Sequence, residues 1–395
     1  MSRITLKDIA NRLGVSKATI SLALRGSREI GEETRKKIIK TAKEMGYRPD
    51  PTLAKIAASR WKPHIASEQI PLAFVASLHP DHEKLIPEDA KKHPLPYLKD
   101  SEHQEEWVIY LSGHAHFKGA IQRADELGYS MSYHLYKPGD NIRSLSNALY
   151  HRGVQGIIFS PIFDRDFIKH FQWKRFACVS VADHYYLPPT DFVVPKLSSH
   201  IHVVFSHLYR KGYSRPGLVL YHEKIQHLNN HILRGVFLSL CESVGILNNI
   251  PAPYYVEHSK LENIKPWLDK EMPDVIIGFS DFIYDLLANF GYKMPQDYSF
   301  VSLGVKKPKE KLIAGVIDAD FMMGRTGVDI LDHKLRHGIF GPTERRTFTT
   351  IQTDWCEGKS LPKKKGVSPA ELRKIKENAD FLNIFADPKS IDVAP

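Results

Sequence analysis

TLKDIANRLGVSKATISLALR, residues 5–25, is the stretch that decides the fold of the N-terminal part of the chain. One apolar face of a first helix is formed by Leu6, Ile9, Ala10 and Leu13. Gly14 then supplies a tight turn, because glycine takes a positive φ at little cost. Ser16 can cap a second helix, Lys17 to about Leu24. The stretch therefore predicts a helix-turn-helix.

The second helix is the one that we expect to read DNA, because the second helix of this motif enters the major groove. Its inward residues are Ile20, Ala23 and Leu24. Its outward residues are Lys17, Ala18, Ser21 and Leu22. A third helix, Glu32 to about Met45, is predicted from the apolar stripe Ile38, Ile39, Ala42 and Met45.

Positive charge is concentrated in the same part of the chain. Residues 1–62 contain 15 Lys and Arg against 6 Asp and Glu, a balance of +9 (15 − 6). The whole chain has a net charge of +10, so the remaining residues sum to about zero. A local positive field beside a helix-turn-helix indicates a protein that neutralises DNA phosphates.

A short linker follows these helices. The segment 48–51, Arg-Pro-Asp-Pro, predicts extended backbone, since a residue before proline avoids the helical region. Asp50 and Pro51 can then begin a short helix over 52–59. The apolar edge of that helix, with Leu53 and Ile56, has two interpretations. It is either a wedge for a minor-groove base step or the packing face of a linker helix.

The block TLKDIANRLGVSKATISLALRGSREIGEETRKKIIKTAKEMGYRPDP resembles the DNA-binding head of the lactose-repressor (LacI) family of bacterial regulators. This resemblance implies a homodimer on a palindromic operator, with a hinge helix in the minor groove. By position, the base-reading places are held by Lys17, Ala18 and Leu22. The phosphate-contact places are held by Thr5, Ser16, Thr19, Ser21, Thr34 and Tyr47. Ile56 holds the wedge place, and Arg25 and Leu53 are further candidates for DNA contact.

Two positions of the head depart from the family pattern. Leu22 stands where the family usually has Arg, and Arg25 stands where it usually has Asn. Leucine can contact a thymine methyl group but cannot grip guanine with two hydrogen bonds. We therefore expect an operator that differs from the commonest half-site of the family.

From Ile70 onward, short apolar runs alternate with amphipathic stretches. Strands are predicted at Ile70–Ser77, Met131–Leu135, Gly156–Ser160, Ala177–Ala182, Pro216–Tyr221, Asp274–Gly278 and Ser299–Leu303. Helices are predicted at Gly113–Leu127, Ile142–Arg152, Ser199–Lys211, Leu228–Val244 and Asp281–Phe290. This alternation predicts an α/β body of two doubly wound parallel-sheet lobes, with helices on both faces of each sheet.

The body resembles the periplasmic-binding-protein-like body of the same family over about residues 70–360. That resemblance implies three crossovers between the lobes, near 195–197, 316–318 and 347–350. The resulting division is a head at 1–48, a hinge helix at 49–62, an N-terminal lobe at 70–196 and 318–346, a C-terminal lobe at 197–317 and 347–362, and an extension at 363–395.

Ligands of such folds bind at the carboxyl ends of strands. The candidate effector residues are therefore His79, Asp183, His184, Asn229, Asn230, Ser280 and Asp281, with Phe321 placed to stack on a sugar ring. Carboxylates and amides with one aromatic ring suit a hydroxyl-rich ligand, although Asp281 as a helix cap and Asp183 as a loop residue are alternatives. An arginine and an aspartate that the family often uses are replaced by Ile232 and Gly304, so the sequence does not identify the sugar.

Two further segments differ from the family pattern. Residues 80–106 are polar and rich in proline, and they form either a surface insertion or a lid over the cleft. Ser368 and Glu371 form a capping box for a helix in the C-terminal extension. That helix either packs on the body or contributes to a tetramerising coiled coil.

The composition excludes several classes of protein. No apolar run of about 18 residues predicts a membrane span, and the N-terminus does not resemble a signal peptide. Three distant cysteines indicate a reducing cytoplasm and give no disulfide or zinc pattern. The paired histidines at 114 and 116 and at 200 and 202 fall in or beside predicted helices, where i and i+2 do not share a face. With no catalytic motif present, we predict no catalytic residue, metal site or cofactor.

The sequence therefore predicts a bacterial cytoplasmic transcription regulator that associates with the nucleoid through DNA. We expect a homodimer on double-stranded operator DNA that represses carbohydrate-utilisation genes. We also expect a small effector, a sugar, in the cleft between the lobes. The alternative is a sugar-binding protein whose basic head associates with DNA nonspecifically.

Overall fold

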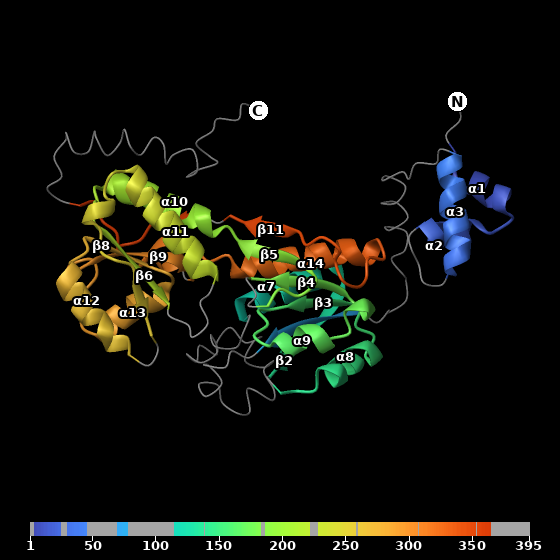
Figure 1. Cartoon of the computed structure of the whole chain (residues 1–395), viewed down its shortest axis with the longest axis horizontal. Helices are drawn as coiled ribbons and strands as arrows, with labels where there is room; N and C mark the ends of the chain where they lie inside the picture. Colours follow the sequence, from blue (N-terminus) through green and yellow to red (C-terminus); the bar gives the residue numbers. More distant parts are fainter. Residues whose placement is uncertain are drawn as a thin grey trace. The chain divides into compact units, whose positions relative to one another are not determined.

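The computed structural model describes residues 4–24, 30–45, 69–77, 114–137, 139–182, 186–221, 228–257, 260–306, 308–352 and 354–364 (Figure 1). The chain divides into two compact units, residues 1–192 with 324–347 and residues 193–323 with 348–395. It passes between them after Phe192, Met323 and Thr347. The predicted hinge helix, the 80–106 segment and the helix of the C-terminal extension lie outside the described residues.

The head consists of α1 (Leu6–Leu13), α2 (Lys17–Leu24) and α3 (Glu32–Glu44). Its core is made of buried side chains from all three helices, namely Ile9, Ala10, Ile20, Ala23, Ile38 and Ala42. One member of the predicted stripe of α3 is wrong. Ile39 is 48% exposed, and Thr41 is buried in its place, because the inward face follows 38, 41, 42 and 45.

The first unit is built on a six-stranded sheet in the order β11-β5-β4-β3-β1-β2, whose strand β11 and most of β5 fall in the residue ranges grouped with the second unit. Its strands are β1 (Ile70–Ser77), β2 (Tyr129–Tyr136), β3 (Gly156–Phe159), β4 (Ala177–Val181), β5 (Asp191–Pro195) and β11 (Phe348–Ile351). β1 pairs in parallel with β2 and β3, and β3 pairs in parallel with β4. β3 and β4 are buried along their whole length, which is typical of parallel strands covered on both faces.

Alternate residues of β1 face the two helical layers of this unit. Ala73 and Val75 belong to a core shared with α8 (Ile142–His151) and α9 (Arg165–His170). A short 3₁₀ turn, Trp173–Arg175, adds its Trp173 ring to that core. Phe74 points the other way, toward the second helical layer.

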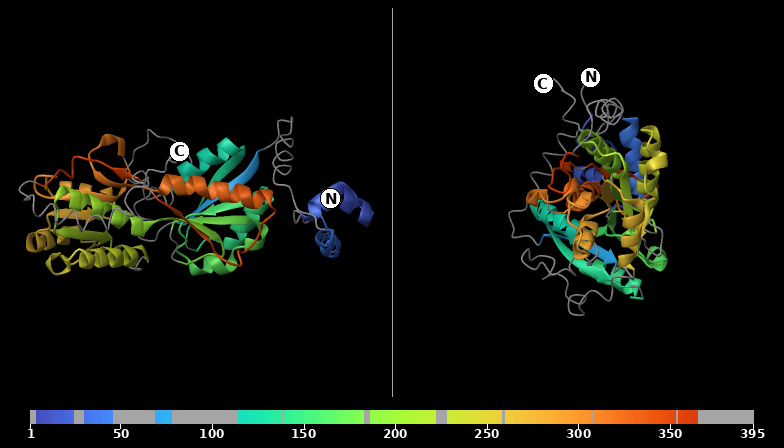
Figure 2. Two further views of the ribbon diagram at one scale, coloured as in Figure 1. Left: turned by 90° about the horizontal axis from the view of Figure 1, so that it is seen from above. Right: turned by 90° about the vertical axis from the view of Figure 1, so that its left-hand side faces the viewer.

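The second layer consists of α7 (His114–Leu127) and α14 (Asp320–Arg336), which lie side by side (Figure 2). Phe74 packs edge-on against Phe117 of α7, with ring centroids 5.5 Å apart. A Cβ atom on Gly324 of α14 would stand 1.9 Å from the backbone carbonyl oxygen of His116. Only glycine therefore permits this approach of the two helices.

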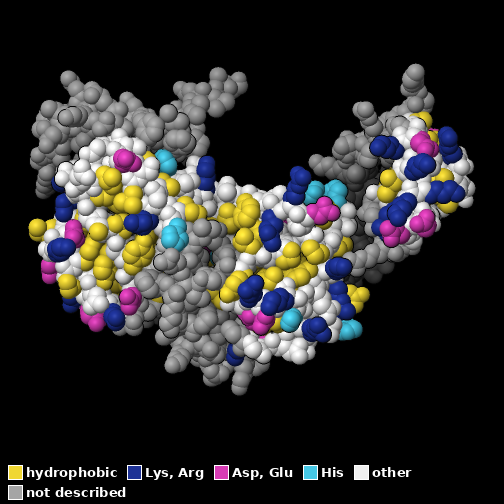
Figure 3. Space-filling view, in the orientation of Figure 1, with side chains coloured by type: hydrophobic (Ala, Val, Ile, Leu, Met, Phe, Trp, Pro, Cys, Tyr) yellow, Lys and Arg dark blue, Asp and Glu magenta, His cyan; other side chains and the backbone are white. Residues whose placement is uncertain are grey.

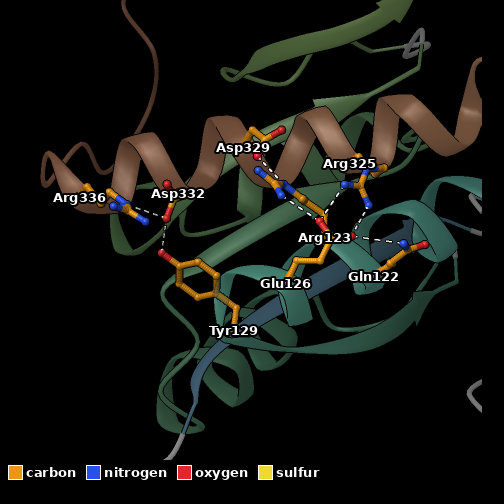
Figure 4. Close-up of polar contacts among 8 residues, drawn as sticks. All are labelled: Gln122, Arg123, Glu126, Tyr129, Arg325, Asp329, Asp332 and Arg336. Atoms are coloured by element: carbon orange, nitrogen blue, oxygen red, sulfur yellow. Dashed lines mark hydrogen bonds and ion pairs between the residues drawn. The ribbon is translucent and has the colours of Figure 1, made fainter. Parts of the chain in front are cut away.

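Ion pairs fix α14 against α7 along the outer surface (Figure 4). The Arg123 guanidinium donates to Asp329 at 2.7 Å and to Glu126 at 2.9 Å. Arg325 grips both carboxylate oxygens of Glu126, at 2.8 and 2.7 Å. Hydrogen bonds from Arg325 and Arg123 hold the pKa of Glu126 down to about 2. The two helices are thus joined by charge as well as by close backbone contact.

One nearly buried ion pair holds the strands at the place where the chain leaves the first unit. Lys334 Nζ of α14 lies 2.5 Å from Asp191 Oδ2, and these side chains are only 7% and 12% exposed. Asp191 Oδ1 accepts hydrogen bonds from the Thr347 hydroxyl at 2.7 Å and from the Thr347 backbone N–H at 3.1 Å. Burial alone would raise the pKa of Asp191, but hydrogen bonds from Lys334 and Thr347 outweigh it and lower the pKa. We call these three residues the charged clamp.

The second unit is built on another six-stranded sheet, in the order β12-β10-β9-β8-β6-β7. Its strands are β6 (Pro216–Tyr221), β7 (Tyr254–Val256), β8 (Val275–Gly278), β9 (Ser299–Val305), β10 (Ala314–Ile317) and β12 (Trp355–Cys356). All recorded pairings are parallel except that of β12 with β10, which is antiparallel. With helices on both faces, each unit is a doubly wound α/β lobe, as the sequence predicted.

Two pairs of helices cover the second sheet. α10 (Leu197–Lys211) and α11 (Leu228–Ser243) share a core with one face. α12 (Ile264–Glu271) and α13 (Asp281–Asn289) share a core with the other face. Short 3₁₀ turns occur at Leu247–Asn249, Leu261–Asn263 and Pro308–Glu310.

The end of the second unit is held by buried hydroxyl groups and by more exposed ion pairs, Lys211 with Glu357 and Lys364 with Asp274, each at 2.7 Å. Ser360 Oγ accepts from the backbone N–H of Ala314 at 2.9 Å and donates to the carbonyl oxygen of Phe300 at 2.7 Å. The Tyr213 hydroxyl donates to the carbonyl oxygen of Pro362 at 2.8 Å. These neutral bonds join the segment after β12 to the strands beside it.

Among the described residues, no helix combines the length and the apolar character needed to cross a bilayer.

Candidate functional site

The helix-turn-helix is shaped by three local devices. Asp8 accepts hydrogen bonds from the backbone N–H and the hydroxyl of Thr5, at 2.8 and 2.7 Å, which fixes the start of α1. Gly14 ends α1 with φ +65°, as the sequence predicted. Ser16 Oγ accepts from the backbone N–H of Thr19 at 3.0 Å, which confirms Ser16 as the cap of α2.

These caps leave the start of α2 open for contact. The exposed residues of the predicted DNA-binding set are Thr5, Ser16, Lys17 and Thr34. Thr19 and Leu22 are half-buried, and the Thr19 hydroxyl is hydrogen-bonded to Ser16 Oγ at 2.8 Å. Ala18 and Ser21 lie within α2, and their side chains are outside the description. Arg25, Tyr47, Leu53 and Ile56 also lie outside the described residues.

The head carries a dense set of exposed cations (Figure 3). They are Lys7, Arg12, Lys17, Lys36, Lys37, Lys40 and Lys43. Lys36 Nζ lies 3.3 Å from Glu32 Oε1, and both side chains are exposed. An exposed ion pair of this kind contributes little energy, so Lys36 is only weakly held by Glu32. Such a surface can attract the phosphates of a nucleic acid.

A second candidate site lies at the carboxyl ends of the strands in the second unit. Asn230 Nδ2 donates to the carbonyl oxygen of Tyr221, the last residue of β6, at 2.6 Å. The Tyr221 ring lies 5.5 Å from the ring of Phe279, which follows β8. Asp281 opens α13, and its Oδ2 accepts from the backbone N–H of Lys306 at 2.9 Å. The structure thus places Asn230 and Asp281 along one edge of the sheet.

Two buried oxygen atoms at this edge have no hydrogen-bond partner among the described residues. They are Asn229 Oδ1, at the start of α11, and Asp281 Oδ1. An unpaired buried acceptor is costly, so both favour a ligand that donates hydrogen bonds. Ser280 directly precedes α13, and Phe321 is 38% exposed in the first turn of α14.

Sequence reasoning missed Asp318 at the same edge. It directly follows β10, a strand that the sequence analysis had treated only as a crossover. Its Oδ1 accepts from the backbone N–H of Asp320 at 2.7 Å. The general rule for residues that follow strands would have found it, had β10 been recognised.

Fewer of the predicted effector residues of the first unit can be placed. The candidates His79, Asp183 and His184 lie outside the described residues. At the carboxyl edge of its sheet, the backbone N–H of Ser77 donates to Ser160 Oγ at 3.3 Å. Ser77 Oγ is buried with no hydrogen-bond partner in the part of the chain that the structure describes.

The histidines do not assemble a metal centre within the described ranges. No group of three or more His, Cys, Asp or Glu side chains is placed to hold a metal ion there. His116 and His200 instead lie inside α7 and α10 as buried side chains. Burial lowers the pKa of His200 to about 4, while a backbone hydrogen bond to Leu303 opposes that shift.

With this geometry established, comparison with known proteins places the head. The profile of the family "Bacterial regulatory proteins, lacI family" matches residues 5–50. The N-terminal domain belongs to the lacI family. The matched range covers α1, α2 and α3, so the helix-turn-helix prediction is confirmed.

Curated relatives match only a short part of the chain. The regulator GntR of Pseudomonas aeruginosa is 34% identical over 90 residues, 22% of this chain and 26% of that protein. The regulator AglR of Rhizobium meliloti is 37% identical over 57 residues, 14% of this chain and 16% of that protein. The match spans about a sixth to a quarter of the length of these relatives. Both are named as helix-turn-helix transcriptional regulators.

Solved structures resemble the chain over most of its length. A complex of the transcriptional regulator CelR with cellobiose has a TM-score of 0.53 at 16% identity, covering 91% of this chain and 100% of that one. A lacI-family regulator from Bacillus cereus subsp. cytotoxis has a TM-score of 0.53 at 14% identity, covering 75% of this chain and all of that one. A lacI-family regulator from Enterococcus faecium with bound ribose has a TM-score of 0.50 at 14% identity, covering 74% and 100%. These likenesses confirm the predicted fold class.

Proposed function

We propose that this protein is a sequence-specific transcription regulator that binds operator DNA and is controlled by a small hydroxyl-rich ligand. The observation that carries the proposal is the lacI-family head, whose second helix is capped by Ser16 and presents Lys17 to solvent. The exposed cations around it supply the sequence-independent part of DNA affinity.

The finer features of the proposal follow the family. The protein would act as a homodimer on a palindrome, repress carbohydrate-utilisation genes, and work on the bacterial chromosome in the cytoplasm. Two structural neighbours were solved with a sugar, cellobiose in one and ribose in the other. Their likeness, together with the acceptor-rich edge of the second unit, supports a sugar as the effector class.

We infer that the effector is held by the groups at the carboxyl edges of the strands. In the second unit these are Asn229, Asn230, Ser280, Asp281 and Phe321. His79 and Asp183 remain the proposed contributions of the first unit. A ligand can change DNA affinity only if it binds two states of the protein unequally, so effector and operator affinities must change together.

Selection of operator sequences from genomic fragments tests the function. The full-length protein is incubated with sheared bacterial genomic DNA at two salt concentrations. The bound fragments are then sequenced. We expect one recurrent palindrome whose affinity exceeds nonspecific affinity by about 10³-fold or more. Fragments without a recurrent palindrome would leave the alternative, a sugar-binding protein with a nonspecific basic head.

The variant Leu22→Arg sharpens the same experiment. Arginine can pair bidentately with guanine, so one position of each half-site should change to guanine while overall DNA affinity is kept or raised. The matched control is Lys40→Arg on α3, an exposed cation exchanged for another cation. It should leave the selected sequence unchanged.

A further inference from the structure

One end of the second unit carries apolar side chains that the described residues leave uncovered. Leu247, in the short turn after α11, is 38% exposed, and Met272, directly after α12, is 68% exposed. Arg215 connects the two places, because its guanidinium donates to the carbonyl oxygens of Asn249 and Glu271. Leu247 lies two residues before Asn249, and Met272 directly follows Glu271. The two exposed side chains therefore belong to one surface.

This surface is also the edge of a core that the described residues cover only in part. Val244 of that core is buried, whereas Ile246 and Ile250, which pack against it, are half-buried. Tyr209 of α10 belongs to the same core and is 4% exposed, yet its hydroxyl has no hydrogen-bond partner among the described residues. A buried hydroxyl without a partner is destabilising. Apolar cover and a polar partner for Tyr209 are therefore both to be expected from another segment.

Met272 is an unfavourable residue for its position unless something covers its side chain. It ends α12 with φ +42°, in the left-handed region where glycine or asparagine is usual. A side chain is strained there because its Cβ approaches the following carbonyl oxygen. Methionine is flexible and fills irregular apolar gaps well. A contact with another segment would explain why methionine stands at this position.

The chain leaves the described region beside this surface. Lys364, the last described residue, donates its backbone N–H to the Lys211 carbonyl oxygen at 2.9 Å, and its Nζ lies 2.7 Å from Asp274 Oδ2. Asp274 follows Met272 by two residues. Burial raises the pKa of the Tyr209 hydroxyl, and the charge of Asp274 adds to that shift. Because Asp274 lies near both Lys364 and Tyr209, the continuing chain starts close to the hydroxyl that needs a partner.

The 31 residues after Lys364 (395 − 364) contain a segment that fits this surface. After the capping box of Ser368 and Glu371, an apolar stripe follows at helical spacing, made of Leu372, Ile375, Ala379 and Leu382. A helix of this length is marginal in water unless its apolar face is packed. The eight steps from Lys364 to Leu372 span up to about 27 Å when extended, so the stripe can reach Met272.

We propose that the amphipathic segment 368–382 docks on its own chain, on the surface formed by Ile246, Leu247, Ile250 and Met272. We call this surface the tail patch. The apolar stripe covers Leu247 and Met272, and a polar group of the segment serves as the partner of the Tyr209 hydroxyl. The tail patch lies at the amino ends of β6 and β8, whereas the candidate effector residues follow the carboxyl ends of strands. It is therefore a separate site, and it buries the stripe that a tetramerising coiled coil would need.

Disulfide trapping in the full-length protein tests the docking directly. Met272→Cys is combined in turn with a cysteine at each of the four stripe positions, and mild oxidation is followed by electrophoresis and peptide mapping. The three native cysteines are buried and so contribute little background. We expect a disulfide within one chain for at least one stripe position. It should form at least fivefold faster than in the control pair with Glu377→Cys, which lies on the opposite face of the helix.

Oxidation of Met272 by dilute peroxide, followed by mass spectrometry, gives a second test. The double variant Leu372→Asp with Ile375→Asp places charges in the stripe and should release the segment. Met272 should then be oxidised at least threefold faster than in the parent, because its thioether becomes accessible. The matched control, Arg373→Asp with Lys374→Asp, introduces two aspartates outside the stripe and should leave the rate unchanged.

Three results would overturn the proposal. Disulfides that join two chains would mean that the tail patch receives the segment of a second copy. Sedimentation that shows a tetramer in the parent and a smaller assembly in Leu372→Asp with Ile375→Asp would assign the stripe to a coiled coil. Equal trapping at Glu377 and at the stripe, with an unchanged oxidation rate of Met272 in the stripe variant, would mean that the segment does not cover the patch.

Discussion

The two α/β units have the same strand order, yet they are held together in different ways. In the first unit the charged clamp joins α14 to the strands where the chain leaves the unit. In the second unit the segment after β12 is held by the hydroxyl groups of Ser360 and Tyr213 together with two more exposed ion pairs, Lys211–Glu357 and Lys364–Asp274. The carboxyl edges both carry carboxylates: in the first sheet Asp164 accepts from the Tyr136 hydroxyl, and in the second Asp281 and Asp318 accept from backbone N–H groups.

This difference shows that one topology accepts unlike chemistry at equivalent tasks. The strand order follows from alternating buried strands and helices, which any suitably patterned sequence supplies. The last strand and the sheet edge depend on individual side chains. Stability and ligand choice should therefore respond very differently to changes in the two units.

The largest effect is expected from breaking the charged clamp. Lys334→Met leaves the Asp191 carboxylate nearly buried without its countercharge, which should lower the free energy of unfolding by about 3–5 kcal/mol. Urea unfolding followed by circular dichroism measures the change. The paired variant Asp191→Asn with Lys334→Met removes both charges and should recover most of the loss. No recovery would show that the charges are not the cause.

A smaller effect is expected from the neutral link in the second unit. Ser360→Ala removes two hydrogen bonds and leaves the buried Ala314 N–H without its acceptor, which should cost about 1–3 kcal/mol. Its cost should not vary between pH 5 and 8, because no titrating group is removed. A cost that changed with pH would contradict the comparison.

The smallest effect is the acid sensitivity that both units share. Burial lowers the pKa of His200 in the second unit and of His134 in the first to about 4, from an ordinary value of 6.5. The unfolded chain therefore binds more protons between these values. Stability is fully present above pH 6.5 and falls as the pH drops toward 4. At pH 5.5 the loss should be about 1 kcal/mol for the buried His200.

Two single variants, one in each unit, measure how much of this loss of stability at acid pH comes from each histidine. Because neither variant has a group to protonate, His200→Gln and His134→Gln should each flatten part of the fall in stability between pH 6.5 and 4. Unfolding curves at pH 7.5 and 5.5 give the comparison. An acid limb that kept its full slope in both variants would show that other groups cause it.

Local signals explain why the head could be predicted closely from sequence. Ser16, Gly14 and the Thr5–Asp8 pair act within a few residues of each other, and the structure contains each of them. The prediction that Ile39 is buried was wrong, because two adjacent apolar residues, Ile38 and Ile39, could each have filled the same inward position. Helical spacing favoured 38, 41 and 42.

The sequence predicted the central strands of the body. It did not predict the features that depend on contacts between residues far apart in the chain. The strands of both sheet centres were found to within two residues, because continuous apolar runs mark them. α14 was missed, since Gly324 and Gly327 weaken its helical pattern, and their value lies only in close contact with α7 and the first sheet. The partnership of Lys334 with Asp191 leaves no sequence signal, because the residues are far apart in the chain.

The clamp also has a consequence for the order in which the protein can be made. Residues 193–323 belong to the second unit, and they are synthesised between Asp191 and Lys334. During translation the first sheet must therefore wait for α14, with its face toward that helix uncovered and the Asp191 carboxylate unpaired. Contacts such as that of Arg123 with Asp329, 206 residues apart, form late and close a very long loop. The nascent first unit thus exposes apolar surface of the kind that promotes misfolding until α14 has been made.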